Sequence, residues 1–232
     1  MAGAILLPDS RFRSPTAADN VADMRNENVF SAVVLQHGAT GQTKTFTVPQ
    51  GQTIPRLNGS AITVPTSGHQ VTYTELTTNL SQAGQLGAAL GDAAIKGIGC
   101  MIEQGYTDAN GVLNTYGAGQ QETCEILAKC FFQLKIAGKK QIEGPVAFFP
   151  TPGGPSGSIS TTENSSTVSL ANNGTRGPKA LKLPIMCGRT DTVEGVVGVA
   201  GSDSLAFSVT SGVGQPVLLW VNLETTLKGD VR

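Results

Sequence analysis

Short apolar runs, separated by Gly, Pro and Asn, constrain the fold of this chain more than any other feature. The runs have the length of β-strands, and several alternate apolar with polar residues. In residues 44–48, for example, polar Lys44, Thr45 and Thr47 alternate with apolar Phe46 and Val48. Parallel α/β folds need a crossover of about a dozen residues, usually a helix, between strands. The sequence does not have such helices between most of its predicted strands. The pattern therefore predicts an all-β protein.

The predicted strands recur along almost the whole chain. They cover residues 29–35, 44–48, 61–64, 70–76, 93–102, 131–136, 141–149, 180–187, 193–199, 205–210 and 216–223. We expect hairpins at 61–76 and at 131–149, the latter with its turn at Gly138-Lys139-Lys140. So many short strands are typical of a β-sandwich or jelly roll. A single jelly roll is favoured, because a double one needs about twice the eight strands of a single one; a compact double version stays open.

Two short helices are expected beside the sandwich. Residues 120–129 have Ile126 and Leu127 at helical spacing and Glu122 near the N-terminal end. Residues 16–28 are the second candidate, with Pro15 before them. We expect residues 1–28 to form an N-terminal arm and 29–232 to form the jelly-roll domain. Within that domain, residues 150–177 are rich in Gly, Pro, Ser and Thr, which predicts a long exposed loop with a minor strand at 167–170.

Charge is scarce in this chain. Only 14% of the residues are charged, against roughly 25% in ordinary globular proteins. With 16 Lys and Arg against 17 Asp and Glu, the chain has no basic excess for binding nucleic-acid phosphates, so no specific nucleic-acid recognition is expected. A nearly neutral surface favours self-association. The apolar stretch at residues 4–7 is too short for a signal peptide, and no apolar run is long enough to span a membrane, so we expect synthesis in the cytoplasm.

No group of residues in the sequence matches a known catalytic pattern. Ser156, in Pro155-Ser156-Gly157, lacks the flanking pattern of a nucleophile elbow. His37 and His69 each adjoin a Gly and are interpreted as turn residues. The sequence at 117–122 has Glu122 where the dinucleotide-binding pattern needs its last Gly. We therefore expect no enzyme activity, no catalytic residue and no cofactor.

Metal binding and covalent modification are also not expected. The four cysteines have no CxxC spacing and lie in apolar segments, which favours buried free thiols over zinc ligands; they are Cys100, Cys124, Cys130 and Cys187. Asp108-Ala109-Asn110-Gly111 indicates a tight turn rather than a calcium loop. Four glycosylation sequons are interpreted as chance products of composition; they begin at Asn58, Asn79, Asn164 and Asn173. Trp220 lies in an alternating apolar strand and is expected to pack in the interior.

The order of several segments resembles a known group of proteins. The segments are Thr78-Asn79-Leu80-Ser81-Gln82-Ala83-Gly84-Gln85-Leu86, Ile95-Lys96-Gly97-Ile98, residues 131–139 with Gly144-Pro145 and Phe149-Pro150, and residues 217–223 with Leu227-Lys228-Gly229 and Arg232. Over residues 70–232 this order resembles the jelly-roll capsid proteins of tailless icosahedral bacteriophages. The resemblance implies a shell subunit that assembles as trimers or larger groups with other virion proteins, and a possible contact with an internal membrane.

Three functions follow as hypotheses. The first is a structural protein of the virion, a capsid subunit that binds copies of itself through repeated symmetric interfaces. The alternative is a carbohydrate-binding or receptor-attachment β-sandwich of the spike or lectin type, with Tyr106 and Tyr116 as candidate contacts. A metal enzyme of the cupin type is disfavoured, because the chain has only two His.

Overall fold

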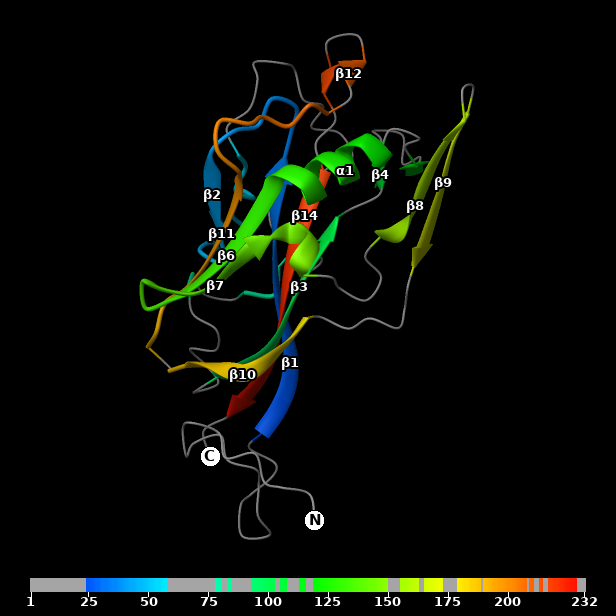
Figure 1. Ribbon diagram of the computed structural model, residues 1–232. Coiled ribbons are helices and arrows are strands. Elements are labelled where there is room, and N and C mark those ends of the chain that lie inside the picture. The colour runs from blue at the N-terminus through cyan, green and yellow to red at the C-terminus, as the bar shows by residue number, and fades with distance from the viewer. Residues whose placement is uncertain are drawn as a thin grey trace, which may run out of the picture.

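The computed structural model is mostly strands with one α-helix (Figure 1). It describes residues 24–57, 78–80, 83–84, 93–102, 105–107, 113–115, 119–149, 155–162, 165–172, 179–188, 190–207, 209–210, 213–214 and 217–228. Strands make up 61% of the structure. The expectation of an all-β fold is thereby confirmed, and it includes two antiparallel four-stranded sheets.

The first sheet has the order β1-β14-β3-β10. Its strands are β1 (Met24–Leu35), β14 (Val217–Lys228), β3 (Ala93–Ile102) and β10 (Lys179–Cys187). Every neighbouring pair is antiparallel. The pairing of β1 with β14 brings together strands from opposite ends of the sequence. β3 is buried along most of both faces, as its unbroken apolar run predicts.

The second sheet has the order β2-β11-β6-β7. Its strands are β2 (Gln42–Thr45), β11 (Val193–Val199), β6 (Cys130–Ile136) and β7 (Lys139–Pro145). Burial alternates strictly along β6, so Phe132, Leu134 and Ile136 face the interior while the residues between them are half-buried. The β6–β7 hairpin of the sequence analysis is confirmed.

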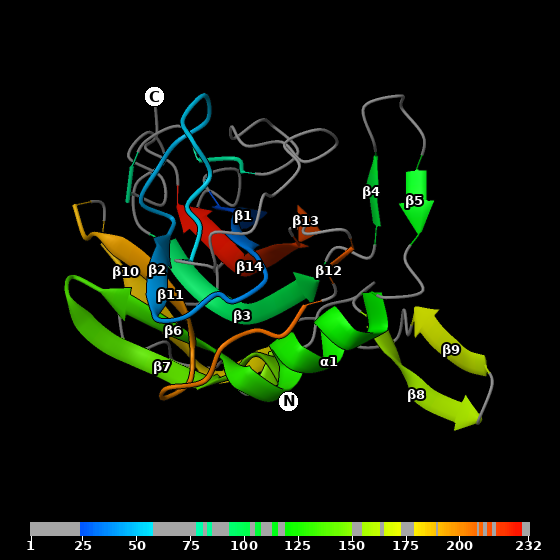
Figure 2. The same cartoon turned by 90° about the horizontal axis from the view of Figure 1, so that it is seen from above.

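The main core lies between the two sheets (Figure 2). Phe132 of β6 meets Phe149 edge-on, with ring centroids 5.5 Å apart. On β14, Leu219, Val221 and Leu223 face this core, as the alternation predicts. Trp220 points the other way. It packs on a smaller cluster outside the first sheet with Ala32, Val34, Ile54 and Leu218, so it is not part of the main core.

Smaller elements surround the two sheets. The helix α1 (Gly119–Lys129) confirms the helix predicted at 120–129, and η3 (Val146–Phe148) is a 3-10 turn after β7. Three further pairs of strands form two-stranded ribbons. They are β4 (Gly105–Thr107) with β5 (Leu113–Thr115), β8 (Pro155–Thr162) with β9 (Ser165–Asn172), and β12 (Val209–Thr210) with β13 (Val213–Gly214).

The N-terminal prediction is wrong where the structure describes it. Residues 24–28, expected at the end of a helix and of an arm, belong to β1 and pair with residues 224–228 of β14. The helical spacing of charges in this segment is outweighed by pairing with the C-terminal strand, which a local pattern does not reveal. The rest of the predicted helix and arm, residues 1–23, lies outside the described residues.

The predicted loop at 150–177 is also wrong, because it contains the β8–β9 ribbon. The pairing runs over eight residue pairs from Pro155–Asn172 to Thr162–Ser165, and the minor strand expected at 167–170 is part of β9. Ser156 therefore lies in a strand and not in a linker. Ser and Thr are compatible with both loops and strands, so composition alone was misleading.

Three smaller expectations need correction. Residues 205–210 are not one strand: Leu205 and Phe207 are buried core residues outside any strand, and β12 is only Val209–Thr210. The strand predicted at 141–149 ends at Pro145. The turn before it is at Ala137 and Gly138, which both have positive φ angles, and not at Gly138-Lys139-Lys140. The hairpin predicted at 61–76 lies outside the described residues.

Candidate interaction surface

The outer edge of β1 is covered by the chain itself. Phe30 N donates to Asn79 Oδ1 at 2.9 Å, and Asn79 Nδ2 donates to the Asn28 carbonyl at 2.7 Å. Farther along, Val34 N donates to the Pro55 carbonyl at 2.9 Å. These contacts occupy backbone groups that an added strand would need. The Asn79 side chain is thus used structurally.

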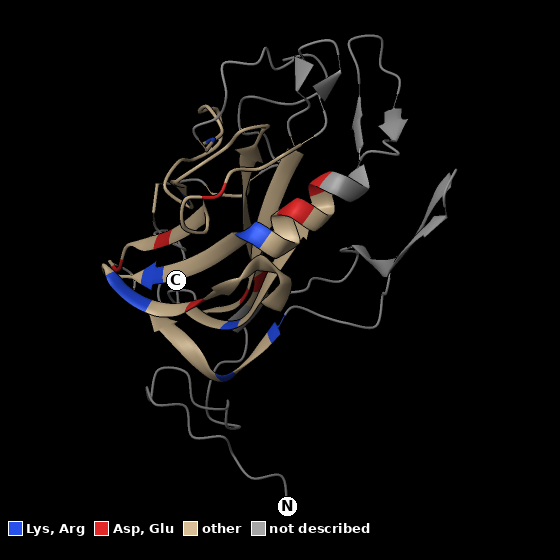
Figure 3. Cartoon of the chain, turned by 45° about the horizontal axis from the view of Figure 1, so that its top comes forward, with Lys and Arg blue, Asp and Glu red and all other residues tan. Residues whose placement is uncertain are grey.

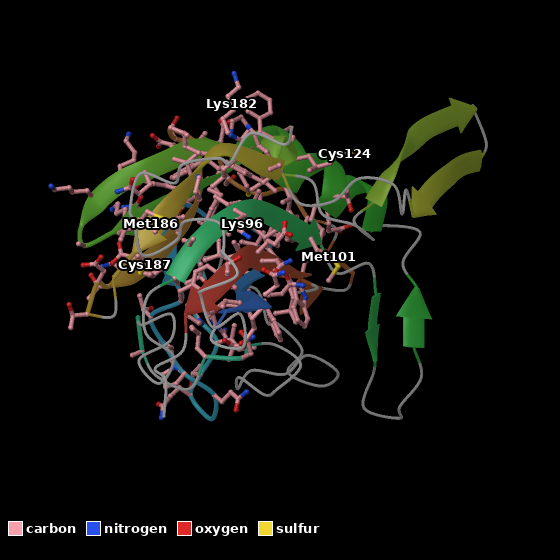
Figure 4. The ribbon with its side chains drawn as sticks, turned by 90° about the horizontal axis from the view of Figure 1, so that it is seen from below. Lys96, Met101, Cys124, Lys182, Met186 and Cys187 are labelled. Carbon is pink, nitrogen blue, oxygen red and sulfur yellow. The ribbon has the colours of Figure 1, made fainter. Side chains whose placement is uncertain are left out.

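The other three sheet edges carry features that discourage pairing with another chain. β2 has only four residues. β7 begins with Lys139 and Lys140 and ends with Pro145. β10 carries Lys179, Lys182 and Pro184, and its register with β3 shifts between Ala180 and Ile185. Figure 4 labels Lys182, Met186 and Cys187 on β10 and Lys96 on the neighbouring strand β3. Short strands, lysines, prolines and bulges are the usual means of protecting a sheet edge.

Among the described residues, two large apolar side chains are exposed. Phe148 in η3 is 59% exposed, and Leu183 in β10 is 67% exposed. The Lys179 ammonium lies 5.6 Å from the Phe148 ring centroid and 5.3 Å from the Phe149 ring centroid. A Cβ at Gly144 would be in ordinary van der Waals contact with Phe148 Cδ2, at 3.4 Å. The exposed Phe148 ring thus has a cationic neighbour on its own chain.

Figure 3 marks the described charged residues on the ribbon, and several of them form local ion pairs. Glu194 pairs with Lys44 at 2.7 Å and with Lys135 at 3.6 Å. On α1, Glu125 pairs with Lys129 at 2.6 Å, and that hydrogen bond lowers the pKa of the Glu125 carboxyl. Glu125 also accepts a hydrogen bond from Ala206 N at 3.3 Å, so this pair connects α1 to the segment that carries Leu205 and Phe207. These contacts are structural.

Three of the four cysteines are buried as predicted. Burial raises the pKa of the Cys100 thiol, and the neighbouring Cys130 raises it further. Burial likewise raises the pKa of Cys130 to about 12, so neither side chain is a thiolate at neutral pH. Cys187 is buried too, whereas Cys124 on α1 is exposed, which contradicts the expectation for that residue.

The other residues singled out in the sequence do not converge. His37 lies in a turn, as expected, with Nδ1 hydrogen-bonded to the Phe207 carbonyl. The remaining candidates lie outside the residues whose side chains are described: His69, Tyr106, Asp108, Asn110, Tyr116, Gly117, Asn58, Asn164 and Asn173. Within the described part, no three His, Cys, Asp or Glu side chains are grouped as metal ligands. No helix among the described residues is long and apolar enough to cross a membrane.

A cavity of about 310 Å³ lies beside the β6–β7 turn. Most side chains that line this cavity are small and uncharged, and the exceptions are Lys135 and Glu194, which form an ion pair. The lining residues are Thr47, Ala83, Gly84, Lys135, Gly138, Thr192, Val193 and Glu194. These residues do not include a nucleophilic side chain paired with a general base, as covalent catalysis would need. The exposed apolar residues and the strand edges are therefore the stronger candidates for function.

Comparison with known proteins gives no further guide: no family model, no curated protein and no solved structure matches this chain. The sequence analysis did not identify Phe148, Lys179 or Leu183 as surface residues. The β8–β9 ribbon did leave a signal, since Ile159 and Val168 stand at equal distances from the two residues, Glu163 and Asn164, that separate its strands.

Proposed function

We propose that the two four-stranded sheets form a single jelly roll. Counted in chain order, the first strand of the eight pairs with the eighth, β1 with β14, and the second with the seventh, β2 with β11. The third pairs with the sixth, β3 with β10, and the fourth with the fifth, β6 with β7. This is the pairing of one long hairpin, and rolling it up adds the contacts β14–β3 and β11–β6. Eight antiparallel strands in two sheets are typical of a jelly roll.

The function that this fold and surface support best is that of a capsid subunit of a virion. Jelly rolls recur in viral capsids, and the strand order is the observation that carries the proposal. Because a fold alone does not define a function, the surface must agree with it. Few charges lower the cost of burying the surface in contacts, and Phe148 and Leu183 are exposed apolar anchors. The partners would be further copies, as trimers or larger groups, and other virion proteins, with an internal membrane as a further contact.

The test is the oligomeric state of the purified chain, measured by size-exclusion chromatography with light scattering. We expect a discrete oligomer or a closed particle whose amount increases with concentration. Replacing Phe148 and Leu183 together by Ser should weaken assembly, whereas Lys139→Ser on the protected edge of β7 should not. A chain that stays monomeric at high concentration, with its particle partners present, would contradict the proposal.

One observation favours the carbohydrate-binding alternative. Lectins also use jelly rolls, and Phe148 is an exposed aromatic ring beside Lys179. A glycan array separates the two functions. A capsid subunit should give no specific signal, whereas a signal lost in Phe148→Ala, Tyr106→Ala or Tyr116→Ala would favour the alternative.

A further inference from the structure

Among the described strands, the β8–β9 ribbon differs from the edges of the two four-stranded sheets, and it is longer than the other two ribbons. It projects beside the two sheets in both views, and its strands pair with each other and with no further described strand (Figures 1 and 2). An isolated two-stranded hairpin is at best marginally stable in water. A ribbon of eight residue pairs, about 27 Å long at about 3.4 Å per residue, would gain stability from a third strand.

The edge of β9 lacks the protection found at the edges of the two four-stranded sheets. All four edges of the two sheets are covered, very short, or marked by Lys and Pro. By contrast, neither β8 nor β9 contains a charged residue, and their register has no irregularity over its full length. Because unprotected edges readily pair with another chain, the ribbon is the place where pairing is permitted. A polypeptide strand is the occupant that fits this edge, because it can pair with the backbone N–H and C=O groups that otherwise bond to water.

The edge of β9 offers more hydrogen bonds than the edge of β8. In a hairpin with two residues between its strands, the pair next to the turn, Thr162–Ser165, exchanges hydrogen bonds, and so does every second pair after it. The outward N–H groups of β9 are then those of Ser166, Val168, Leu170 and Asn172. On β8 one of the corresponding outward positions is Pro155, which has no N–H.

We infer that β9 pairs with β9 of a second copy across a two-fold axis, which gives a four-stranded antiparallel sheet. This inference rests on the proposed function and names the contact through which copies associate. With the axis at Ser169, Val168 lies opposite Leu170 of the other copy, and Ser166 lies opposite its Asn172. All four outward N–H groups of each β9 then find a carbonyl.

The two faces of the ribbon agree with this register. Ile159 and Val168 are cross-strand partners, and Leu170 shares their face two residues along. Pairing Val168 with Leu170 of the second copy gives a row of Ile159, Val168, Leu170 and Gly157 across the four strands, so three of its four positions are apolar. The opposite face consists of Ser, Thr and Ala, and like edges meet without charge repulsion. A two-fold contact of identical edges is self-complementary.

A cysteine at the proposed axis provides the direct test. In this register Ser169 faces its own copy at a non-hydrogen-bonded position, where Cα atoms are about 4.5 Å apart, close enough for a disulfide. Because Cys124 is exposed, the experiment uses Cys124→Ser as background. Under mild oxidation we expect Ser169→Cys to form a covalent dimer and Ser160→Cys, on β8, to remain uncrosslinked. Equal crosslinking of both variants, or none in assembled protein, would overturn the inference.

A second variant pair tests the hydrogen bonds themselves. Ser166→Pro removes one outward N–H of β9 and leaves the bonds inside the hairpin intact, while Ser166→Thr keeps the N–H. We expect at least a tenfold rise in the concentration needed for assembly with Pro and little change with Thr; equal assembly of the two would count against the pairing.

If the native chain assembles but Ser169→Cys does not crosslink, only the β9 contact fails. If crosslinked dimers form and no larger assembly does, the shell function fails and the β9 contact stands. If the native chain is always monomeric and the Ser169→Cys variant never crosslinks, both the shell function and the β9 contact are contradicted.

Discussion

At the scale of single residues, backbone conformation limits which side chains this fold accepts. Phe46 and Ala137 are non-glycine residues with positive φ angles, 63° and 48°. Phe46 follows β2, is fully buried, and its carbonyl accepts a hydrogen bond from Gly84 N at 2.8 Å, so packing holds it there. Ala137 is exposed, so packing does not hold its side chain, although its N–H donates to the Thr192 carbonyl at 2.8 Å.

One substitution in the β6–β7 turn should therefore raise the stability of the protein. Ala137 and Gly138 both have positive φ, the arrangement in which Asn-Gly is preferred. We expect Ala137→Asn to raise the free energy of unfolding by about 1 kcal/mol, measured by chemical denaturation. Gly138→Ala is the matched control. Its Cβ would meet no atom within 4 Å, so a loss of about 1 kcal/mol would come from the backbone alone. Destabilisation by Ala137→Asn would contradict this account of the turn.

Gly195 of β11 is required for a different reason, which is close packing. A Cβ there would lie 2.5 Å from Thr45 Cγ2 and 3.0 Å from Phe132 Cε2. We expect Gly195→Ala to cost about 1–3 kcal/mol through overpacking, with Gly144→Ala as a comparison at a position where a Cβ would make only ordinary contacts. Thermal unfolding of the two variants measures the difference. An unchanged melting temperature for Gly195→Ala would show that the second sheet is looser than described.

At the scale of elements, the covered edge of β1 depends on Asn79. Asn79→Ala removes the acceptor for Phe30 N and the donor to the Asn28 carbonyl. Loss of these two bonds should lower stability by about 1–2 kcal/mol and speed hydrogen exchange at the Phe30 amide. Asn79→Asp keeps an acceptor for Phe30 N and should protect that amide better than Ala does. Equal exchange in all three proteins would mean that other groups protect this edge.

The contact between α1 and the segment at 203–206 should depend on pH. The Lys129 hydrogen bond lowers the pKa of Glu125 below its ordinary value of 4.5. A group whose pKa is lower in the folded state stabilises the protein above its unfolded pKa, and this contribution is lost as the pH falls through the folded pKa. Glu125→Gln should thus be less stable than the native chain by at most about 1 kcal/mol at neutral pH, and the difference should shrink below pH 4.5. A difference that is constant from neutral to acid pH would contradict this role.

Elements with a clear period could be predicted from the sequence, and elements defined by distant pairing could not. The apolar run at 193–199 predicted the bounds of β11 correctly. The pairing of residues 24–28 with β14 spans nearly the whole chain, and nothing local indicates it. Likewise Phe148 and Leu183 resemble core residues in sequence, and only the end of β7 and the bulge of β10 expose them.

At the scale of the whole molecule, the described part is a charge-poor body in which the edges of the two four-stranded sheets are protected and the β9 edge of the β8–β9 ribbon is not. The protected edges limit pairing between bodies, while the exposed apolar residues and the β8–β9 ribbon remain for contacts with other copies. Each contact would be small compared with the roughly 800 Å² per partner of a stable interface. Association would thus depend on many contacts closing together in a symmetric assembly.

Electron microscopy of the assembled protein, with the subunit resolved at strand level, tests the central claim most directly. The account predicts closed symmetric particles in which each subunit has the strand orders β1-β14-β3-β10 and β2-β11-β6-β7. Monomers at every concentration with the particle partners present, or subunits with a different strand order, would contradict it.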